Sequence, residues 1–308
     1  MYERIPFQVQ IFWQWFDYLL QQAEANGKEL CLMNLDETAI YRCAMKARGY
    51  ISKSRCEHTG RVPARFVNKS LQRGTATHVS IITHKTDLQG VLPQFVLLNQ
   101  RTFKVSDLPD GNTSGLQFWR GETAWNTAAK MVRILEAIAC KLADKTGTLQ
   151  PVILLDMAPC HIDHEVIAAA NRLGLWLLYV PARLTYLLQP LDVAAFCRFK
   201  QHLNSLFLAR QDATGTLKTS DWIRTLCALG KTFWRGTPWK STFQAVGLFG
   251  KQTDLIEEIR CMGLLRKKDG PTAMPTEEEL QTIWPRKKTV PFGSLLWLPA
   301  KLAIDDID

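Results

Sequence analysis

The sequence has no CxxC pair, although it contains eight cysteines. Zinc sites and the disulfide frameworks of small secreted domains usually show close, regular cysteine spacing, and neither pattern is visible here. The cysteines are instead spread along the chain, at Cys31, Cys43, Cys56, Cys140, Cys160, Cys197, Cys227 and Cys261. Reduced thiols in a cytosolic or nuclear protein are the simplest explanation of this distribution.

Long apolar runs are also missing. No run approaches the roughly 18 apolar residues of a membrane-spanning helix, and the first ten residues lack the basic-then-apolar order of a secretory signal. We therefore expect a soluble, intracellular chain with no membrane partner. Hydrophobic residues nevertheless make up 46% of the chain, with 10 Trp and 14 Phe, which is enough to form a substantial core.

Acidic residues are scarce in one segment. Between Arg42 and Arg73 there are nine Lys and Arg side chains and one acid, Glu57, so these 32 residues hold +8 of the net charge of +9. Such a segment is either an ordinary solvated surface or a basic arm that follows a phosphate backbone, and composition alone favours neither.

Apolar patterns predict an α/β protein. Residues 7–25 have the spacing of an amphipathic helix that ends near Asn26 and Gly27. Short apolar runs predict strands, at 30–35, 78–83, 91–98, 151–155 and 175–180. Helices are expected at 122–145, at 163–173 and from about Leu191, and the first of them is predicted to bury Trp125, Ala128, Val132, Leu135, Ala139 and Leu142. This order indicates a mixed sheet flanked by helices.

Three aspartates follow elements of this expected sheet. Asp36 and Asp156 stand where apolar strands end, and Asp192 stands at a helix start after the next strand. Open α/β sheets place their chemistry beyond the carboxyl ends of strands, and a cluster of acids is tolerated there when divalent cations neutralise it. A single aspartate in such a position is more often a helix cap or a turn residue, and Asp192 in particular has that alternative.

The residues around the acids form three ordered motifs. Residues 34–38 (NLDET) resemble the N-x-D-E-T signature of pogo/Tigger-type transposases, of the mariner-like superfamily. Residues 156–161 (DMAPCH) resemble the family's D-N-x-P-x-H motif, and residues 180–192 resemble the run P-x-x-x-T-x-x-L-Q-P-L-D. The 35 residues between Asp156 and Asp192 match the family's spacing. A phosphatase of the haloacid dehalogenase type needs an aspartate nucleophile at position 34, where this chain has Asn34.

The resemblance implies a DDE superfamily endonuclease: a ribonuclease H-like catalytic domain with a mixed five-stranded sheet, flanking helices and extra C-terminal helices. It implies that Asp36, Asp156 and Asp192 are catalytic and bind two Mg²⁺ or Mn²⁺ ions. Water would then cleave a phosphodiester at a transposon end, and the freed 3′-hydroxyl would attack target DNA. Supporting roles in or beside the motifs fall to Asn34, Glu37, Thr38, Pro159, His161, Gln189 and Pro190.

The same resemblance makes DNA, both transposon ends and target, the expected partner and the nucleus the expected compartment. Phosphate contacts are expected from the basic side chains Arg48, Lys53, Arg55, Arg61, Arg65, Lys69, Arg73, Arg198 and Lys200. Four regions are predicted: an N-terminal helix (1–27), the catalytic domain (28–213), its helical extension (214–284) and a tail (285–308). Whether the chain forms a homodimer stays open.

Two departures from the family pattern keep other hypotheses open. Met157 replaces the usual Asn of the second motif, and only 35 residues precede Asp36, where complete relatives carry helix-turn-helix modules. We therefore expect a truncated element, a domesticated protein or a catalytic subunit that needs a separate DNA-reading protein. The alternative function is a transposase-derived DNA-binding protein without catalytic turnover, and a decaying copy without a selected role is a third option.

Overall fold

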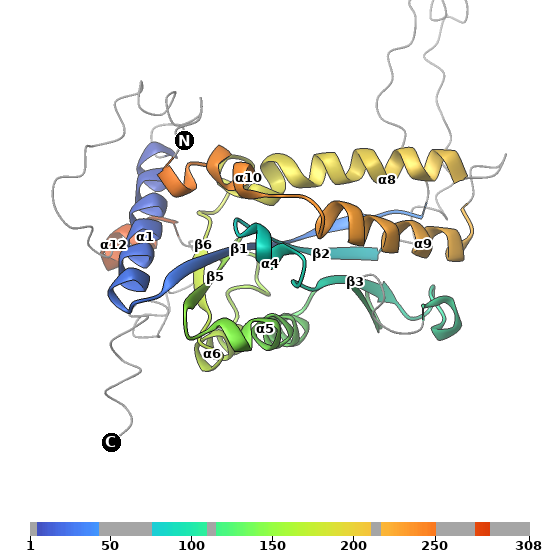
Figure 1. The fold of residues 1–308 in the computed structure, drawn as a ribbon, viewed down its shortest axis with the longest axis horizontal. Coiled ribbons are helices and arrows are strands. Elements are labelled where there is room, and N and C mark those ends of the chain that lie inside the picture. The colour runs from blue at the N-terminus through green and yellow to red at the C-terminus, as the bar shows by residue number, and fades with distance from the viewer. Residues whose placement is uncertain (1–4, 43–75, 110–114, 211–216, 251–274, 284–308) are drawn as a thin grey trace, which may run out of the picture.

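The computed structural model describes residues 5–42, 76–109, 115–210, 217–250 and 275–283. Within these ranges a six-stranded sheet forms the centre of the molecule, in the order β4-β3-β2-β1-β5-β6 (Figure 1). The strands are β1 (Glu29–Ile40), β2 (Ala76–Thr83), β3 (Gln94–Asn99), β4 (Leu116–Gly121), β5 (Leu149–Leu155) and β6 (Trp176–Tyr179). β2 is antiparallel to both of its neighbours, whereas β5 is parallel to β1 and to β6.

This strand order and these directions are those of a ribonuclease H-like sheet, so the predicted α/β class is confirmed. The predicted number of five strands was too low. β4 adds a sixth strand, parallel to β3 at the edge of the sheet. Its sequence, LQFWRG, shows no clean alternation of apolar and polar residues, and only Leu116 is fully buried. Its strand form therefore depends on pairing with β3.

Helices cover both faces of the sheet (Figure 1). On one face lie α5 (Ala128–Leu142) and α6 (His164–Arg172), which pack against each other. On the other lie α8 (Phe196–Arg210), α9 (Thr219–Leu229) and α10 (Lys240–Ala245). The remaining helices are α1 (Ile5–Ala25), α4 (Thr86–Gln89), α7 (Thr185–Leu188) and α12 (Glu277–Ile283). Among the described residues, no helix is both long and apolar enough to cross a membrane.

The N-terminal helix was predicted closely. α1 packs against β1 and β6, and it ends at Ala25, immediately before the predicted boundary. Gly27 has a φ of +67°, a conformation that glycine adopts at little cost and that commonly terminates a helix. The chain then turns directly into β1, which begins at Glu29.

The buried face of α5 was predicted in part: Leu135 and Leu142 are buried, and Ala128, Val132 and Ala139 pack partly buried against the core. The helix begins at Ala128, because Thr127 caps it by accepting a hydrogen bond from the backbone N–H of Lys130. Trp125 therefore precedes the helix and is 75% exposed. The side chains that α5 buries are Met131, Ile134, Leu135, Ile138 and Leu142. The error is therefore Trp125, which was expected on the buried face because the helix was predicted to start six residues too early.

An aromatic cluster joins the helical layer to the sheet. Fully buried His78 on β2 contacts the rings of Phe199 on α8 and Trp234, with centroid separations of 5.2 and 5.1 Å. Trp234 in turn contacts Trp239 at 5.8 Å. These tryptophans come from the Trp-rich segment after α9, so aromatic packing fixes that segment to the sheet.

We predict that His78 makes the stability of the protein depend on pH. Burial lowers the pKa of His78 to about 3. Below pH 6.5 this histidine therefore becomes protonated in the unfolded chain, whereas in the folded chain it stays neutral down to about pH 3. Stability should therefore fall by about 1.4 kcal/mol per pH unit from this residue as the pH drops below 6.5. Replacing His78 with Phe should reduce that slope, measured by urea unfolding between pH 6.5 and 4.

The control for this prediction is His164→Gln. The side chain of His164 is 89% exposed on α6, so its replacement should leave the slope unchanged. An equal slope in His78→Phe and in the wild-type protein would contradict the prediction.

Candidate active site

The register of the sheet brings the first two aspartates together. β1 and β5 are parallel, and their last paired residues are Asn34 and Leu154. Asp36 and Asp156 each follow two residues later along the chain. β5 ends at Leu155, directly before Asp156, as predicted. β1, by contrast, continues beyond Asp36 to Ile40 because it pairs with β2 as far as Ala76. Asp36 is thus inside a strand, at the point where the neighbouring strand has ended.

The third aspartate belongs to a single π turn. Asp192 lies in the turn Leu191–Ala195, which leads directly into α8. Its carboxylate accepts a hydrogen bond from the Thr185 side chain at the start of α7. The buried side chains of α8 are Phe196, Phe199, Leu203 and Phe207.

Asn34 ties this turn to the sheet. Its side chain is fully buried, and its Oδ1 accepts a hydrogen bond of 2.8 Å from the backbone N–H of Leu191. Its Nδ2 donates to the carbonyl oxygen of Leu154 at 3.1 Å. One amide therefore joins β1, β5 and the residue that precedes Asp192, which explains why a polar side chain is buried beside the site.

The charges of the three carboxylates affect one another's pKa values. Burial raises the pKa of Asp36 well above its usual value, and the charges of Glu37, Asp192 and Asp156 raise it further. Burial also raises the pKa of Asp192, and the charge of Asp156 adds to this effect. Each of the three carboxylates therefore takes part in the charge repulsion at this site, which comes in addition to the local hydrogen bonds of each residue.

A histidine connects Asp156 to β1. The Nδ1 atom of fully buried His161 is 2.5 Å from Asp156 Oδ1, and its Nε2 is 3.1 Å from Glu37 Oε1. Burial lowers the pKa of His161, but the Glu37 charge and the hydrogen bonds to both carboxylates outweigh this and hold the pKa well above its usual value. Burial raises the pKa of Asp156, yet the contacts with His161 lower it overall. The backbone N–H of Ala158 also donates to Asp156 Oδ1, at 3.0 Å.

The donor chemistry of the three aspartates fits Mg²⁺ or Mn²⁺. Both ions prefer hard oxygen ligands, and mutual repulsion of these carboxylates is what a divalent cation relieves. The aspartates are nevertheless not the tightest group of candidate ligands. Among the described residues, the one group whose ligand atoms all lie within 4.8 Å of one another is Glu37, Cys160 and His161.

The other predicted motif residues have identifiable places. Thr38 is buried on β1 opposite His78 of β2. Gln189 is fully buried and its backbone carbonyl accepts from Val193, which links it to the turn that carries Asp192. Pro190 directly precedes that turn, and Pro159 lies in the turn before His161. Met157, the departure from the family pattern, packs partly buried against the hydrophobic core.

Most of the predicted basic contacts lie outside the described residues, namely Arg48, Lys53, Arg55, Arg61, Arg65, Lys69 and Arg73. Arg42, the first residue of the basic segment, donates a hydrogen bond to the Thr219 hydroxyl. Arg198 and Lys200 are both exposed on α8, and the charge of Lys200 acts on Asp192. The guanidinium of Arg198 is 5.6 Å from the centre of the Trp239 ring.

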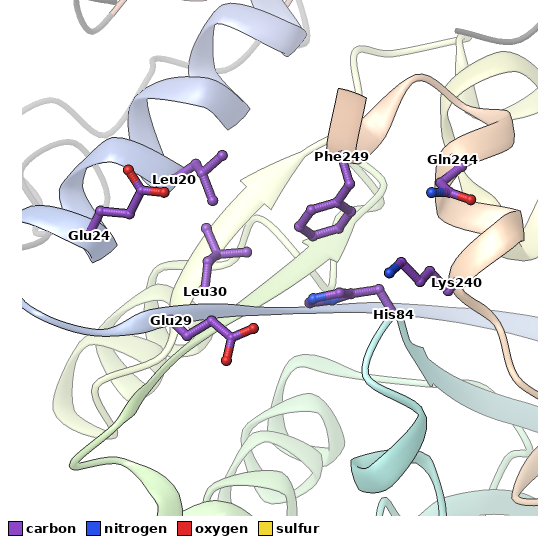
Figure 2. A pocket seen from close by; sticks show the side chains of 8 residues that line it. All are labelled: Leu20, Glu24, Glu29, Leu30, His84, Lys240, Gln244 and Phe249. Carbon is purple, nitrogen blue, oxygen red and sulfur yellow. The ribbon is translucent and has the colours of Figure 1, made fainter. Parts of the chain in front are cut away.

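A cavity of about 480 Å³ lies elsewhere in the molecule (Figure 2). It is lined by Glu29 and Leu30 at the start of β1, by His84 after β2, and by Lys240 and Phe249 from the C-terminal helices. The rings of His84 and Phe249 are stacked, with centroids 4.1 Å apart. Because β1 carries Glu29 at its beginning and Asp36 towards its other end, this cavity is separate from the aspartates.

Solved structures of the Mos1 transposase are similar to this chain. The Mos1 strand transfer complex has 13% identity and a TM-score of 0.46, over 82% of this chain and 60% of that chain. The Mos1 catalytic domain with raltegravir and Mg has 12% identity and a TM-score of 0.44, over 85% and 97%. The chain therefore spans about 60% of the length of the Mos1 protein in the first of these complexes.

No protein-family model matches the chain, and no curated protein matches it. The function is therefore argued from the residues of this chain and their geometry.

The sequence motifs gave no role to three residues that contact the site. Asn126 donates from Nδ2 to Glu37 Oε1, Thr185 donates to Asp192, and Cys160 lies beside His161. Thr185 and Cys160 both fall within the recognised motifs, so their positions were a usable signal. Asn126 lies in the loop before α5, and its sequence neighbourhood carries no sign of a site.

Proposed function

We propose that this chain is a DDE-type DNA transposase catalytic domain of the pogo/Tigger kind, which hydrolyses phosphodiesters and transfers DNA strands with Mg²⁺ or Mn²⁺. The observation that carries the proposal is the geometry around Asn34: β1 and β5 pair in parallel just before Asp36 and Asp156, and the Asn34 amide bonds both to Leu154 and to the turn of Asp192. The three aspartates come from three sequence motifs, in order and at the family's spacing. Asp36 lies on the central strand β1, Asp156 directly follows the neighbouring strand β5, and Asp192 lies in the turn before α8.

The aspartates would hold the metal ions, which activate an attacking oxygen and stabilise the leaving one when they are bound. The chain itself supplies alignment. Asn34 and Thr185 fix the turn of Asp192, while His161 and the backbone of Ala158 fix the Oδ1 atom of Asp156. Fixed ligands of this kind reduce the reorganisation that the reaction requires.

Exposed Lys200 and Arg198 follow Asp192 on α8, where they are placed to contact phosphates near the site. Counterion release from such contacts makes the binding of DNA depend strongly on salt. The basic segment between Arg42 and Arg73 would add to the same electrostatic attraction.

Binding of Mn²⁺ tests the metal site directly. In calorimetry, the wild-type chain should bind Mn²⁺, and Asp156→Ala and Asp192→Ala should each weaken that binding by tenfold or more, because each removes an oxygen ligand. Asp144→Asn is the matched control, since Asp144 is exposed and lies in the loop between α5 and β5. If wild type binds no Mn²⁺ even with DNA present, the nuclease proposal fails.

The alternative is a transposase-derived DNA-binding protein without turnover. The observation that favours it is the 2.5 Å contact between Asp156 and His161, which gives that carboxylate a hydrogen-bond partner without any metal. Salt-dependent DNA binding that survives alanine at all three aspartates, together with no cleavage by wild type, would support this alternative.

A further inference from the structure

The group Glu37, Cys160 and His161 carries a second inference. Glu37 comes from β1, whereas Cys160 and His161 come from the turn after β5. One ligand atom of each residue lies within 4.8 Å of the others, which the three aspartates do not achieve. We propose that these three residues hold a divalent cation of the zinc class, at a site distinct from the aspartates.

The donor atoms decide which cation is selected. A thiolate, an imidazole nitrogen and a carboxylate are the three ligand types that Zn²⁺ takes in proteins, usually with tetrahedral geometry. Mg²⁺ instead requires near-octahedral oxygen ligands and does not bind sulfur. The two neighbouring sites therefore differ in selectivity: the aspartates suit Mg²⁺ or Mn²⁺, and the Glu37–Cys160–His161 site suits Zn²⁺ or Co²⁺.

The orientation of His161 supports a metal ligand. Its Nδ1 is held by Asp156, and its Nε2 faces Glu37 at 3.1 Å. Metal-bound histidines typically have one nitrogen on the ion and donate the other N–H to a carboxylate, which fixes the ring. Ligand atoms around tetrahedral Zn²⁺ are about 3.3–3.6 Å apart, so Glu37 and His161 Nε2 already have nearly the required separation.

Cys160 completes the site with a small adjustment. Its sulfur is within 4.8 Å of the other two ligand atoms, so rotation of a half-buried side chain in a turn has to close at most about 1.5 Å. The cation takes the lone pair of His161 Nε2 and the thiolate of Cys160, and any proton that these atoms carry is released to solvent on binding.

Asn126 provides independent support. Its Nδ2 donates to Glu37 Oε1 and orients that carboxylate. Its Oδ1 is buried and has no hydrogen-bond partner among the described residues. A buried acceptor of this kind costs free energy unless something satisfies it, and a water molecule bound as the fourth ligand of the cation is a donor that would do so.

Co²⁺ tests the site because its bonds to thiolate give a charge-transfer absorption that oxygen ligands do not produce. The reduced full chain, freed of metal with a chelator, should bind Co²⁺ and show this band, and one equivalent of Zn²⁺ should remove it. Cys160→Ser should lose the band. Cys140→Ser should keep it, because Cys140 is exposed on α5 away from this turn.

Two further variants separate this site from folding and from the aspartates. Glu37→Gln keeps the cysteine and should weaken Co²⁺ binding by tenfold or more, with thermal unfolding measured alongside. Asp192→Asn should keep the band, because Asp192 is not a ligand of this site. Absence of the band in wild type, or its persistence in Cys160→Ser, would overturn the inference. Either result leaves the Mn²⁺ test of the aspartates unaffected, since the inference does not rest on the nuclease proposal.

Discussion

Replacing Asp192 with Asn is expected to reduce Mn²⁺-dependent DNA cleavage by about 10³-fold, because a bound metal contributes several kcal/mol to the transition state and each 1.4 kcal/mol is worth a factor of ten. Asn has the same shape and can still accept the hydrogen bond from Thr185, so the variant removes charge and leaves the turn in place. Asp192 is also the exposed member of the three aspartates. Its replacement should therefore leave the free energy of unfolding nearly unchanged.

The measurement is nicking of supercoiled plasmid by wild type, Asp192→Asn and the surface control Asp144→Asn, with Mn²⁺ and with a chelator. Wild type and Asp144→Asn should cleave equally. Unchanged cleavage in Asp192→Asn would show that the nuclease activity comes from a contaminant or from other residues. Loss of cleavage together with loss of folding, seen by thermal unfolding, would contradict the expected intact turn.

The largest effect on stability is expected from Asn34→Leu. The two side chains branch at the same atom and Leu is the larger, so the change leaves no cavity, but it removes the hydrogen bonds to the Leu191 N–H and the Leu154 carbonyl in a fully buried place. An unsatisfied buried backbone group costs about 1–3 kcal/mol, so the free energy of unfolding should fall by about 2–4 kcal/mol. Urea unfolding at pH 7 measures this change.

Asn34→Leu should also weaken Mn²⁺ binding, because the turn that carries Asp192 loses its anchor on β1. Gln201→Leu is the matched control: Gln201 is exposed on α8, and the same kind of amide-to-leucine change should cost less than about 0.5 kcal/mol there. If the two variants lose equal stability, the buried amide of Asn34 is not the anchor that its contacts indicate.

The tests of the two metal sites report on different ligands. The aspartates present only oxygens and the Glu37–Cys160–His161 site presents a sulfur and a nitrogen, so the two readouts, calorimetry with Mn²⁺ and absorption with Co²⁺, report on different ligands. The two sites meet at the contact between Asp156 and His161. Titrating Zn²⁺ into the Mn²⁺-loaded chain would measure the coupling between them.

Much of the fold could be predicted because the information is local. The apolar runs of β1 and β5, the acids that follow them and the glycine after α1 are patterns of a few consecutive residues. The same holds for the motifs around Asp36, Asp156 and Asp192, which are short and ordered. Local patterns did not predict β4, because its strand form depends on pairing with β3. They also placed the start of α5 too early, because the cap formed by Thr127 sets that start at Ala128.

The sequence by itself determined the class of the sheet, the order of its main elements and the three acids that its motifs carry. Only the tertiary structure decided which side chains join them: Asn34 contacts a residue 157 positions away, His161 is 124 positions from Glu37, and Asn126 is 89 positions from it. No pattern along the chain encodes these pairs. They arise because β1 continues past the end of β5, so that residues of β1 face the turns that follow β5 and precede α8, and residues distant in sequence satisfy one another's buried hydrogen bonds there.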